Sequence, residues 1–449
     1  MKKLAKLSLS LVLVLALILS TTSVVLADGP IDIEFWNCQG GNIGAMVETF
    51  VNEFNASQDK YNVVLIYAGG YREALAKLQS TDKANHPDIF MQDLEDAYQV
   101  YADPNGLYVP IQDFIDKDEG YDEPSFLGCL RAAYSNLEGR MLAMPLGNSA
   151  PGLYYNTKLL ADNGLDPEVD LASYAKILET SRKLKAAGVK YPYFHGSSSS
   201  FLSMTLAAQG LAYMDNDNGK AGTPSHCLFG DVGTDCYKAT VEYFDFLQKM
   251  AREDLMFTYG STTDDVQAAW IKGDVAYWCS WISGYPSRRD AVNGAMEFGF
   301  VPMGPISDVP AVGTAASGSC LFVSNSGSEE EQWGAWEFLK FCSSAENNAR
   351  FAIGTGYMPV TEEAVQQPAY QEFITNDFTT AHYSIDAEKK APDTCYNAWL
   401  PMFNEYHALV NEWHGYAINH LDESPEDITA KFAAAVQDCI DLYRMQYGL

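Results

Sequence analysis

The sequence predicts an α/β protein of two lobes, in which open, mostly parallel sheets are flanked by helices. Three observations lead to this fold class. The chain of 449 residues is too long for one compact core. Its first part alternates strand-like and helix-like patterns in the order βαβαβ. No proline-rich linker separates the halves, so we expect crossing strands to join the lobes as a hinge.

The N-terminal alternation can be followed element by element. Residues 31–36 read as a strand, and apolar residues then recur at helical spacing from 43 to 54. The β-branched run 61–67 is typical of a buried strand. A helix over 71–79 and a third strand over 87–91 complete the unit. Ligands gather at the carboxyl ends of such strands, so we look for a site there.

The rest of the chain is richer in helix. Helices are expected over 172–187, 240–251 and 329–341, and residues 266–271 lead through Lys-Gly-Asp into a strand over 275–279. The helix at 329–341 has Ser328 as a plausible N-cap and three acids in its first turn, where the helix dipole favours negative charge. The last third is helical and rich in aromatic residues.

The charge balance excludes several partners. The chain has 29 basic and 59 acidic residues, a formal net charge of −30. Phosphate backbones and anionic membrane surfaces are repelled by such a protein, so we expect no nucleic-acid partner. With 47% hydrophobic and 20% charged residues, the composition argues against disorder.

Residues 1–27 have the layout of a secretory signal peptide. Lys2, Lys3 and Lys6 precede an apolar run over 7–19, and small residues precede a cut after Ala27. An uncleaved membrane anchor is the alternative. No later run of 18 or more apolar residues occurs. We therefore expect an exported protein, at the extracellular face of the membrane or in the periplasm.

The nine cysteines leave at least one thiol unpaired. Cys227 and Cys236 bracket a short loop that a disulfide would suit in an exported protein, and a role as small buried hydrophobic residues is about equally plausible. The acidic turn at 214–219 fails the calcium-loop register, and the spacings of the histidines at 407, 414 and 420 do not fall cleanly on one helical face. We expect no metal and no cofactor.

Enzyme motifs are absent from the sequence. It contains no GxGxxG, GxxxxGK[ST] or GxSxG pattern, so nucleotide-binding and α/β-hydrolase functions have no anchor. A glycosidase needs only two suitably spaced carboxylates and stays open as the chief enzyme alternative.

Aromatic residues near predicted strand ends favour a sugar-binding site. A flat ring fits the apolar face of a sugar, and carboxylates or amides fit its polar rim. The candidates are Trp36, Tyr71, Trp278, Trp281, Tyr357 and Trp399, of which we expect about half to line a cleft. Trp333 and Trp336 are expected in the core.

Several segments together resemble a known family. Residues 144–158 read MPLGNSAPGLYYNTK, and NGLDP follows at 163–167. KGDVA stands at 272–276 and GTGYMPV at 354–360. These segments resemble the extracellular solute-binding proteins of family 1, which serve ABC importers for sugars, and especially the glycerol-3-phosphate and sugar-binding branch.

The resemblance implies a fold, a division into lobes and a role. The fold is the two-lobed type II fold of periplasmic binding proteins, which closes on its ligand. The N-terminal lobe would comprise 28–144 and 280–316, and the C-terminal lobe 145–279 and 317–449. The protein would be a monomer without catalytic activity that delivers a carbohydrate to ABC permease subunits in the membrane.

The resemblance also implies site residues. Tyr71, Ser149 and Tyr357 match binding positions of the branch, and a conserved acid would fall at Asp93 or Glu95. The full set of expected ligand-binding residues is Trp36, Asn37, Tyr71, Asp93, Glu95, Asn148, Ser149, Trp278, Trp281, Ser317, Tyr357, Asn397 and Trp399.

Two departures from the family pattern matter. The branch has a phosphate-binding arginine where this chain has Asn397, so a neutral sugar or oligosaccharide is favoured over glycerol phosphate. No lipobox cysteine occurs near residue 27, which favours a protein without a lipid anchor. Glycerol-3-phosphate, another non-sugar solute such as a polyamine, and a glycan-active enzyme stay as alternatives.

Overall fold

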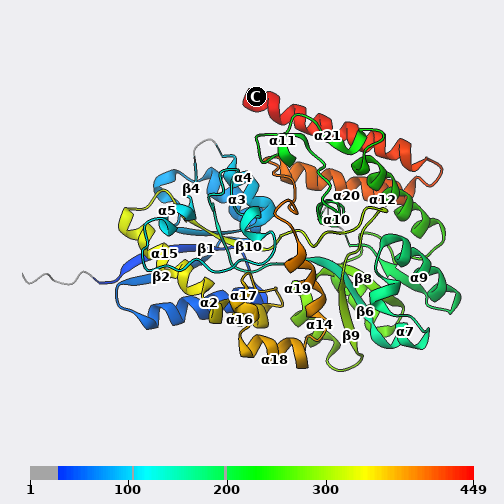
Figure 1. Ribbon diagram of the computed structural model, residues 1–449, viewed down its shortest axis with the longest axis horizontal. Coiled ribbons are helices and arrows are strands. Elements are labelled where there is room, and N and C mark those ends of the chain that lie inside the picture. The colour runs from blue at the N-terminus through cyan, green and yellow to red at the C-terminus, as the bar shows by residue number, and fades with distance from the viewer. Residues whose placement is uncertain (1–28, 104–105, 197–199) are drawn as a thin grey trace, which may run out of the picture.

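The computed structural model describes residues 29–103, 106–196 and 200–449. Two β-sheets lie side by side, each with its own helices, so the molecule has the two lobes that the sequence predicts (Figure 1). The predicted signal peptide at 1–27 lies outside the described residues. Within the described part, no helix is both long enough and apolar enough to cross a bilayer.

The first sheet contains the predicted N-terminal unit. Its strand order is β2 (Tyr61–Tyr67), β1 (Ile31–Asn37), β3 (Ile89–Asp93), β10 (Ser319–Ser324) and β4 (Tyr108–Val109), with β5 (Met144–Pro145) also paired to β10. β1 runs parallel to both β2 and β3, as the βαβαβ pattern predicts. β10 returns antiparallel to β3, β4 and β5.

The second sheet is mixed. Its order is β7 (Tyr191–Phe194), β8 (Val275–Trp281), β6 (Pro151–Asn156) and β9 (Phe298–Pro302). Only β7 and β8 are parallel within it, while β6 is antiparallel to both of its neighbours. The expectation of mostly parallel sheets is therefore wrong in detail, because strands that return from the other lobe enter each sheet antiparallel.

Strand membership also moves the lobe boundaries. β9, which the predicted division placed in the N-terminal lobe, pairs with β6 in the second sheet. β10, which it placed in the C-terminal lobe, pairs with β3 in the first sheet. The chain therefore crosses between the sheets from β5 to β6 and again from β9 to β10. The sequence signal was weak here, because both strands are short apolar runs that fit either sheet.

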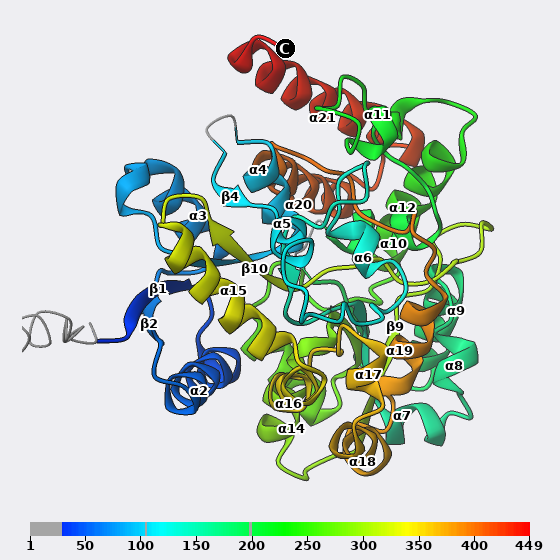
Figure 2. The same cartoon turned by 60° about the vertical axis from the view of Figure 1, so that its left-hand side comes forward.

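Helices cover both sheets (Figures 1 and 2). The first sheet is flanked by α2 (Gly41–Ser57), α3 (Tyr71–Ser80), α4 (Leu94–Tyr101), α15 (Glu329–Ser343) and α16 (Ala345–Thr355). The second is flanked by α7 (Thr157–Asp162), α9 (Tyr174–Ala186), α10 (Ser200–Ala208), α12 (Asp235–Arg252), α13 (Thr263–Lys272) and α19 (Ala381–Lys390). α20 (Phe403–Asn419) and α21 (Pro425–Tyr447) pack on α12.

The remaining helices are short connections. They are α5 (Ile111–Ile115), α6 (Leu130–Ala133), α8 (Pro167–Asp170), α11 (Asp215–Asn218), α14 (Tyr285–Val292), α17 (Glu362–Val365) and α18 (Pro368–Asn376). Single 3₁₀ turns occur at Lys83–Asn85, Leu228–Gly230 and Ile282–Gly284.

Local capping follows the sequence. Ser328 caps α15 and accepts from the Glu331 backbone amide, while the Glu331 side chain accepts from the Ser328 amide, so the predicted N-cap forms a full capping box. Asp93, the last residue of β3, caps α4 by accepting a 2.7 Å hydrogen bond from the Asp96 amide. This cap fixes the turn that carries the candidate acids.

The hydrophobic core continues from one lobe to the other. One cluster contains Phe90 and Phe322 of the first sheet, stacked with ring centroids 4.8 Å apart, and Tyr154 and Phe300 of the second, 4.8 Å apart. Trp336 is fully buried, as predicted, and Trp333 is partly buried against the core. Side chains of both lobes therefore pack together in one hydrophobic cluster around the crossing strands.

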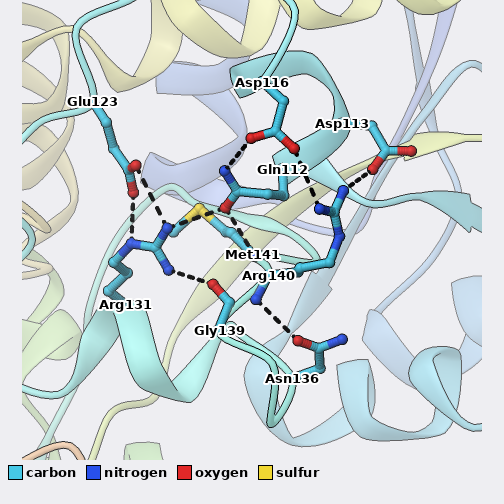
Figure 3. Close-up of polar contacts among 9 residues, drawn as sticks. All are labelled: Gln112, Asp113, Asp116, Glu123, Arg131, Asn136, Gly139, Arg140 and Met141. Carbon is cyan, nitrogen blue, oxygen red and sulfur yellow. Dashed lines mark hydrogen bonds and ion pairs between the residues drawn. The ribbon is translucent and has the colours of Figure 1, made fainter.

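A polar network ties the segment between α5 and β5 together (Figure 3). Arg131 donates to Glu123, Gln112, Ser135 and the Gly139 carbonyl, so all five guanidinium N–H groups can be used. The neighbouring Arg140 pairs with Asp113 and Asp116. These bonds hold the segment in a fixed shape against α5.

The cysteines are all free thiols. Cys227 and Cys236 are buried and not bridged, so the structure favours their role as small hydrophobic residues. Burial raises the pKa of Cys236 to about 12, which keeps this thiol protonated and unreactive. Among the described residues, no group of histidine, cysteine and acidic side chains has the arrangement of a metal site.

Candidate ligand-binding site

A cavity of about 260 Å³ lies where the two lobes meet. It is lined by Tyr71, Arg72, Asp93, Glu95, Ser149, Ser200, Trp281, Ser283, Ser317, Gly318, Tyr357, Phe403 and His407. Elements of the first lobe supply the acids, the arginine and both tyrosines, while β8, α10 and α20 of the second supply Trp281, Ser200, Phe403 and His407. The volume is near the lower end of the usual range for small-molecule sites.

The tyrosine wall comes from two ends of the chain. Tyr71 begins α3 directly after β2, and its hydroxyl donates to Ser319 Oγ at 3.1 Å. Tyr357 follows α16, and the neighbouring Ser319 and Tyr71 partly offset the rise that burial causes in the pKa of its hydroxyl. Because burial raises the pKa of both phenols, they stay neutral and can donate or accept hydrogen bonds.

Glu95 links the two lobes across the cavity. It lies in the first turn of α4 and is 7% exposed. Ser200 Oγ of α10 lies 3.0 and 2.9 Å from its two carboxyl oxygens, and Asn397 Nδ2 lies 2.9 Å from Oε1. Both partners come from the second-lobe side of the cavity, so the carboxyl group holds the lobes together while one side of it faces the cavity.

The electrostatics of the site are dominated by acids. Burial raises the pKa of Asp93, Glu95 and Asp96, and repulsion from Asp93 raises the pKa of Glu95 and Asp96 further. Arg72 opposes these shifts without cancelling them. Burial, followed by repulsion from Arg72, lowers the pKa of His407 to about 4, so this imidazole is neutral at pH 7.

Two aromatic side chains form an apolar wall. Trp281 ends β8 and packs against Phe201, with ring centroids 6.1 Å apart. Phe403 begins α20, one helical turn before His407. A solute in this cavity would meet flat apolar surfaces on one side and acids and hydroxyl groups on the other, which is the combination that a polyhydroxylated molecule requires.

The structure brings about half of the expected site residues together. The cavity is lined by Tyr71, Asp93, Glu95, Ser149, Trp281, Ser317 and Tyr357. Two others lie behind this lining. Asn397 holds Glu95, and the fully buried Asn148 accepts from the Ser317 amide at 3.2 Å.

The remaining expected residues do not reach the cavity. Trp36 is covered by Lys77, whose Nζ lies 3.8 Å from the ring centroid. Arg288 covers Trp278 at 4.8 Å, and Tyr98 and Tyr101 pack against Trp399 with centroids 5.2 and 5.0 Å away. These three tryptophans were expected among the ligand-binding residues but do not line this cavity, because protein groups occupy their faces.

Asn37 also has a local role. Its amide donates to the Gln39 carbonyl at 2.8 Å, and its side-chain oxygen accepts from the Gln39 amide at 3.0 Å. These bonds fix the turn between β1 and α2. Asn37, which was expected to contact the ligand, does not line this cavity.

Six lining residues were not expected from the sequence: Arg72, Ser200, Ser283, Gly318, Phe403 and His407. Arg72 and Gly318 are chain neighbours of expected residues. Gly318 has φ 106°, and a Cβ there would lie 2.2 Å from the Gly147 carbonyl oxygen, so only glycine fits. Phe403 and His407 have no signal beyond the spacing i, i+4 on one helix, which is also typical of a core face.

The fold and the cavity define a two-lobed binding protein of the periplasmic type, with polar and aromatic groups from both lobes around one cavity. The family model described as "Bacterial extracellular solute-binding protein" matches residues 49–377. The chain belongs to this family of solute-binding proteins.

Known relatives agree with this assignment. The sn-glycerol-3-phosphate-binding periplasmic protein UgpB of Brucella melitensis is 26% identical over 351 residues, which cover 77% of each chain. UgpB of Mycobacterium tuberculosis, solved with glycerophosphocholine, superposes with a TM-score of 0.71 at 20% identity over 93% of this chain and 100% of that one. The sugar-binding protein MalE of Xanthomonas citri superposes with a TM-score of 0.72 at 15% identity over 93% and 99%. These structures share the fold.

Proposed function

We propose that the protein is the substrate-binding component of an ABC importer, which captures a sugar or oligosaccharide between closing lobes and delivers it to permease subunits. The observation that carries this proposal is the cavity, in which hydroxyl and carboxyl groups face Trp281 and Phe403 across the lobe boundary. The proposal includes export by the segment 1–27, a monomer at the extracellular face of the membrane or in the periplasm, and no catalytic step or nucleic-acid partner.

The proposed motion follows from the two crossings of the chain. Closure would rotate the sheet β2-β1-β3-β10-β4 against the sheet β7-β8-β6-β9 about the segments between β5 and β6 and between β9 and β10. Ser149 lies in the first of these segments, and its hydroxyl oxygen lies 3.4 Å from that of Ser283, in the 3₁₀ turn that follows β8. A ligand that touches residues of both lobes would favour the closed state by its differential affinity.

Glycerol-3-phosphate is the second candidate, because Arg72 provides a cation that was not expected in the cavity and the UgpB relatives bear that ligand's name. The acidic residues that line the cavity, Asp93 and Glu95, disfavour an anionic ligand such as glycerol-3-phosphate. Two like charges 5 Å apart repel by about 3 kcal/mol at an effective dielectric constant of about 20. A phosphate beside Arg72 would be repelled by Asp93 and Glu95 to the extent that these acids are ionised, and it would raise their pKa values further. We rank the neutral solute first.

A thermal-shift screen separates these candidates. Mono- and oligosaccharides, glycerol-3-phosphate and glycerophosphocholine are added to the mature protein, and the melting temperature is measured. A ligand of the folded state stabilises it by about 2.7 kcal/mol at a hundredfold excess over its dissociation constant. A shift with a saccharide class supports the first proposal. A shift with glycerol-3-phosphate alone would replace it with the second candidate.

A further inference from the structure

The acids around the cavity exceed the positive charge available to them. Asp93 and Glu95 line the cavity, and Asp96 lies directly behind them, 2% exposed. Among the described residues of the lining, Arg72 is the single side chain with a fixed positive charge, and it is solvent-exposed. Desolvation and mutual repulsion disfavour the ionised form of such buried carboxyl groups, so the raised pKa values keep part of them protonated when no cation is bound, and a cation bound there would restore their charge.

The hydrogen-bond acceptors around these acids also outnumber the donors. Glu95 accepts from Ser200 and Asn397, and Asp93 accepts the amide of Asp96. The side-chain oxygen of Asn397, a residue 2% exposed, has no donor within hydrogen-bonding distance. This corner of the site is therefore rich in acceptors.

The aromatic wall suits a cation as well as a sugar. Trp281 and Phe403 line the cavity together with the acids. The faces of aromatic rings attract cations, and this attraction is strongest where water is excluded. His407, on the same helix as Phe403, is neutral at pH 7 and does not compete with a cation there.

Resting on the proposed function, we infer that the natural solute carries a protonated amine, as an amino sugar does, which binds at Asp93 and Glu95 against the aromatic wall. The ammonium group supplies the missing positive charge and up to three hydrogen-bond donors. The hydroxyl groups of the same molecule bind Tyr71, Tyr357 and the serines of the lining. An anionic solute is disfavoured for the same reason that the cation is favoured.

The test compares saccharide pairs in which one member has amines in place of the 2-hydroxyl groups of the other. The dissociation constants of the mature wild-type protein for D-glucose and D-glucosamine, and for cellobiose and the β-1,4-linked glucosamine dimer, are measured by calorimetry at pH 7 and low salt. We expect at least one aminated member to bind ten times more tightly than its neutral partner. Equal or weaker binding of the amines, with a neutral sugar still bound, would overturn the inference and leave the proposed function intact.

Asp93→Asn isolates the charge, because asparagine caps a helix as well as aspartate does. This variant should bring the dissociation constant of the neutral saccharide, divided by that of its aminated partner, close to one. Asp264→Asn, at an exposed first-turn acid of α13, is the matched control and should keep the ratio. Arg72→Gln should raise the ratio, and this variant serves if Asp93→Asn does not fold. An unchanged ratio in both cavity variants would refute the role of these acids. If no saccharide in any pair binds, the proposed function itself fails.

Discussion

Glu388 makes a quantitative prediction about stability and pH. This residue of α19 is fully buried, and its Oε1 lies 3.7 Å from the Cys129 sulfur, while its Oε2 has no partner within hydrogen-bonding distance. Burial raises the pKa of its carboxyl group from 4.5 to about 8, although the nearby Asn148 and Cys129 side chains oppose the shift. The folded protein therefore keeps a proton that the unfolded chain releases near pH 4.5.

The sign and size of the effect follow by linkage. Because the pKa is higher in the folded state, this group's contribution is fully favourable below pH 4.5 and is lost as the pH rises to about 8. At 1.36 kcal/mol per pH unit, the loss is roughly 3 kcal/mol by pH 7 and roughly 5 kcal/mol above pH 8. Glu388→Gln, which mimics the protonated acid, should remove this loss.

Urea denaturation of the wild-type protein and of Glu388→Gln at pH 4.5, 6, 7 and 8 measures this pH-dependent loss of stability. The two proteins should be about equally stable at pH 4.5, and the variant should gain steadily over the wild type at higher pH. The other buried acids titrate in both proteins and cancel in the difference. A difference in unfolding free energy that does not change with pH would refute the reasoning.

Three other predictions concern packing and motion. Arg131→Lys leaves acceptors of the network in Figure 3 unpaired. It should lower the free energy of unfolding, measured by urea denaturation, by about 1 kcal/mol. Lys272→Arg, at an exposed helix end, is the control and should leave this free energy unchanged. Trp399→Ala should cost about 3–5 kcal/mol in the same assay, because the ring packs on Tyr98 and Tyr101; an unchanged stability would place Trp399 outside the core. A saturating ligand should reduce the radius of gyration in solution scattering, and an unchanged radius would exclude closure.

The N-terminal unit could be predicted because its patterns are unambiguous. β1, β2 and the helix between them have strand and helix periods that leave one interpretation, and the capping box at Ser328 is a local signal of four residues. The partners of β9 and β10 could not be predicted, since which sheet a short apolar strand joins depends on contacts far away in the chain.

The site was half predictable for a related reason. Residues that follow strands or belong to the family segments, such as Tyr71, Asp93 and Ser149, do line the cavity. Tryptophans near strand ends could not be divided into core and cleft from sequence, because a Trp face is free or covered depending on neighbours such as Lys77 over Trp36. The position of α20 at the cavity could not be predicted, because Phe403 and His407 lie far in sequence from the other lining residues.

Titration calorimetry of the wild type and Trp281→Ala, with the saccharide that gives the largest thermal shift, tests the central claim most directly. The account predicts one site per chain in the wild type and a dissociation constant at least tenfold weaker, or about 1.4 kcal/mol, in the variant, because Trp281 lines the cavity. Trp333→Ala, at a partly buried position away from the cavity lining, should keep the wild-type affinity. Equal affinity of Trp281→Ala and the wild type would contradict the claim that the solute binds between the lobes.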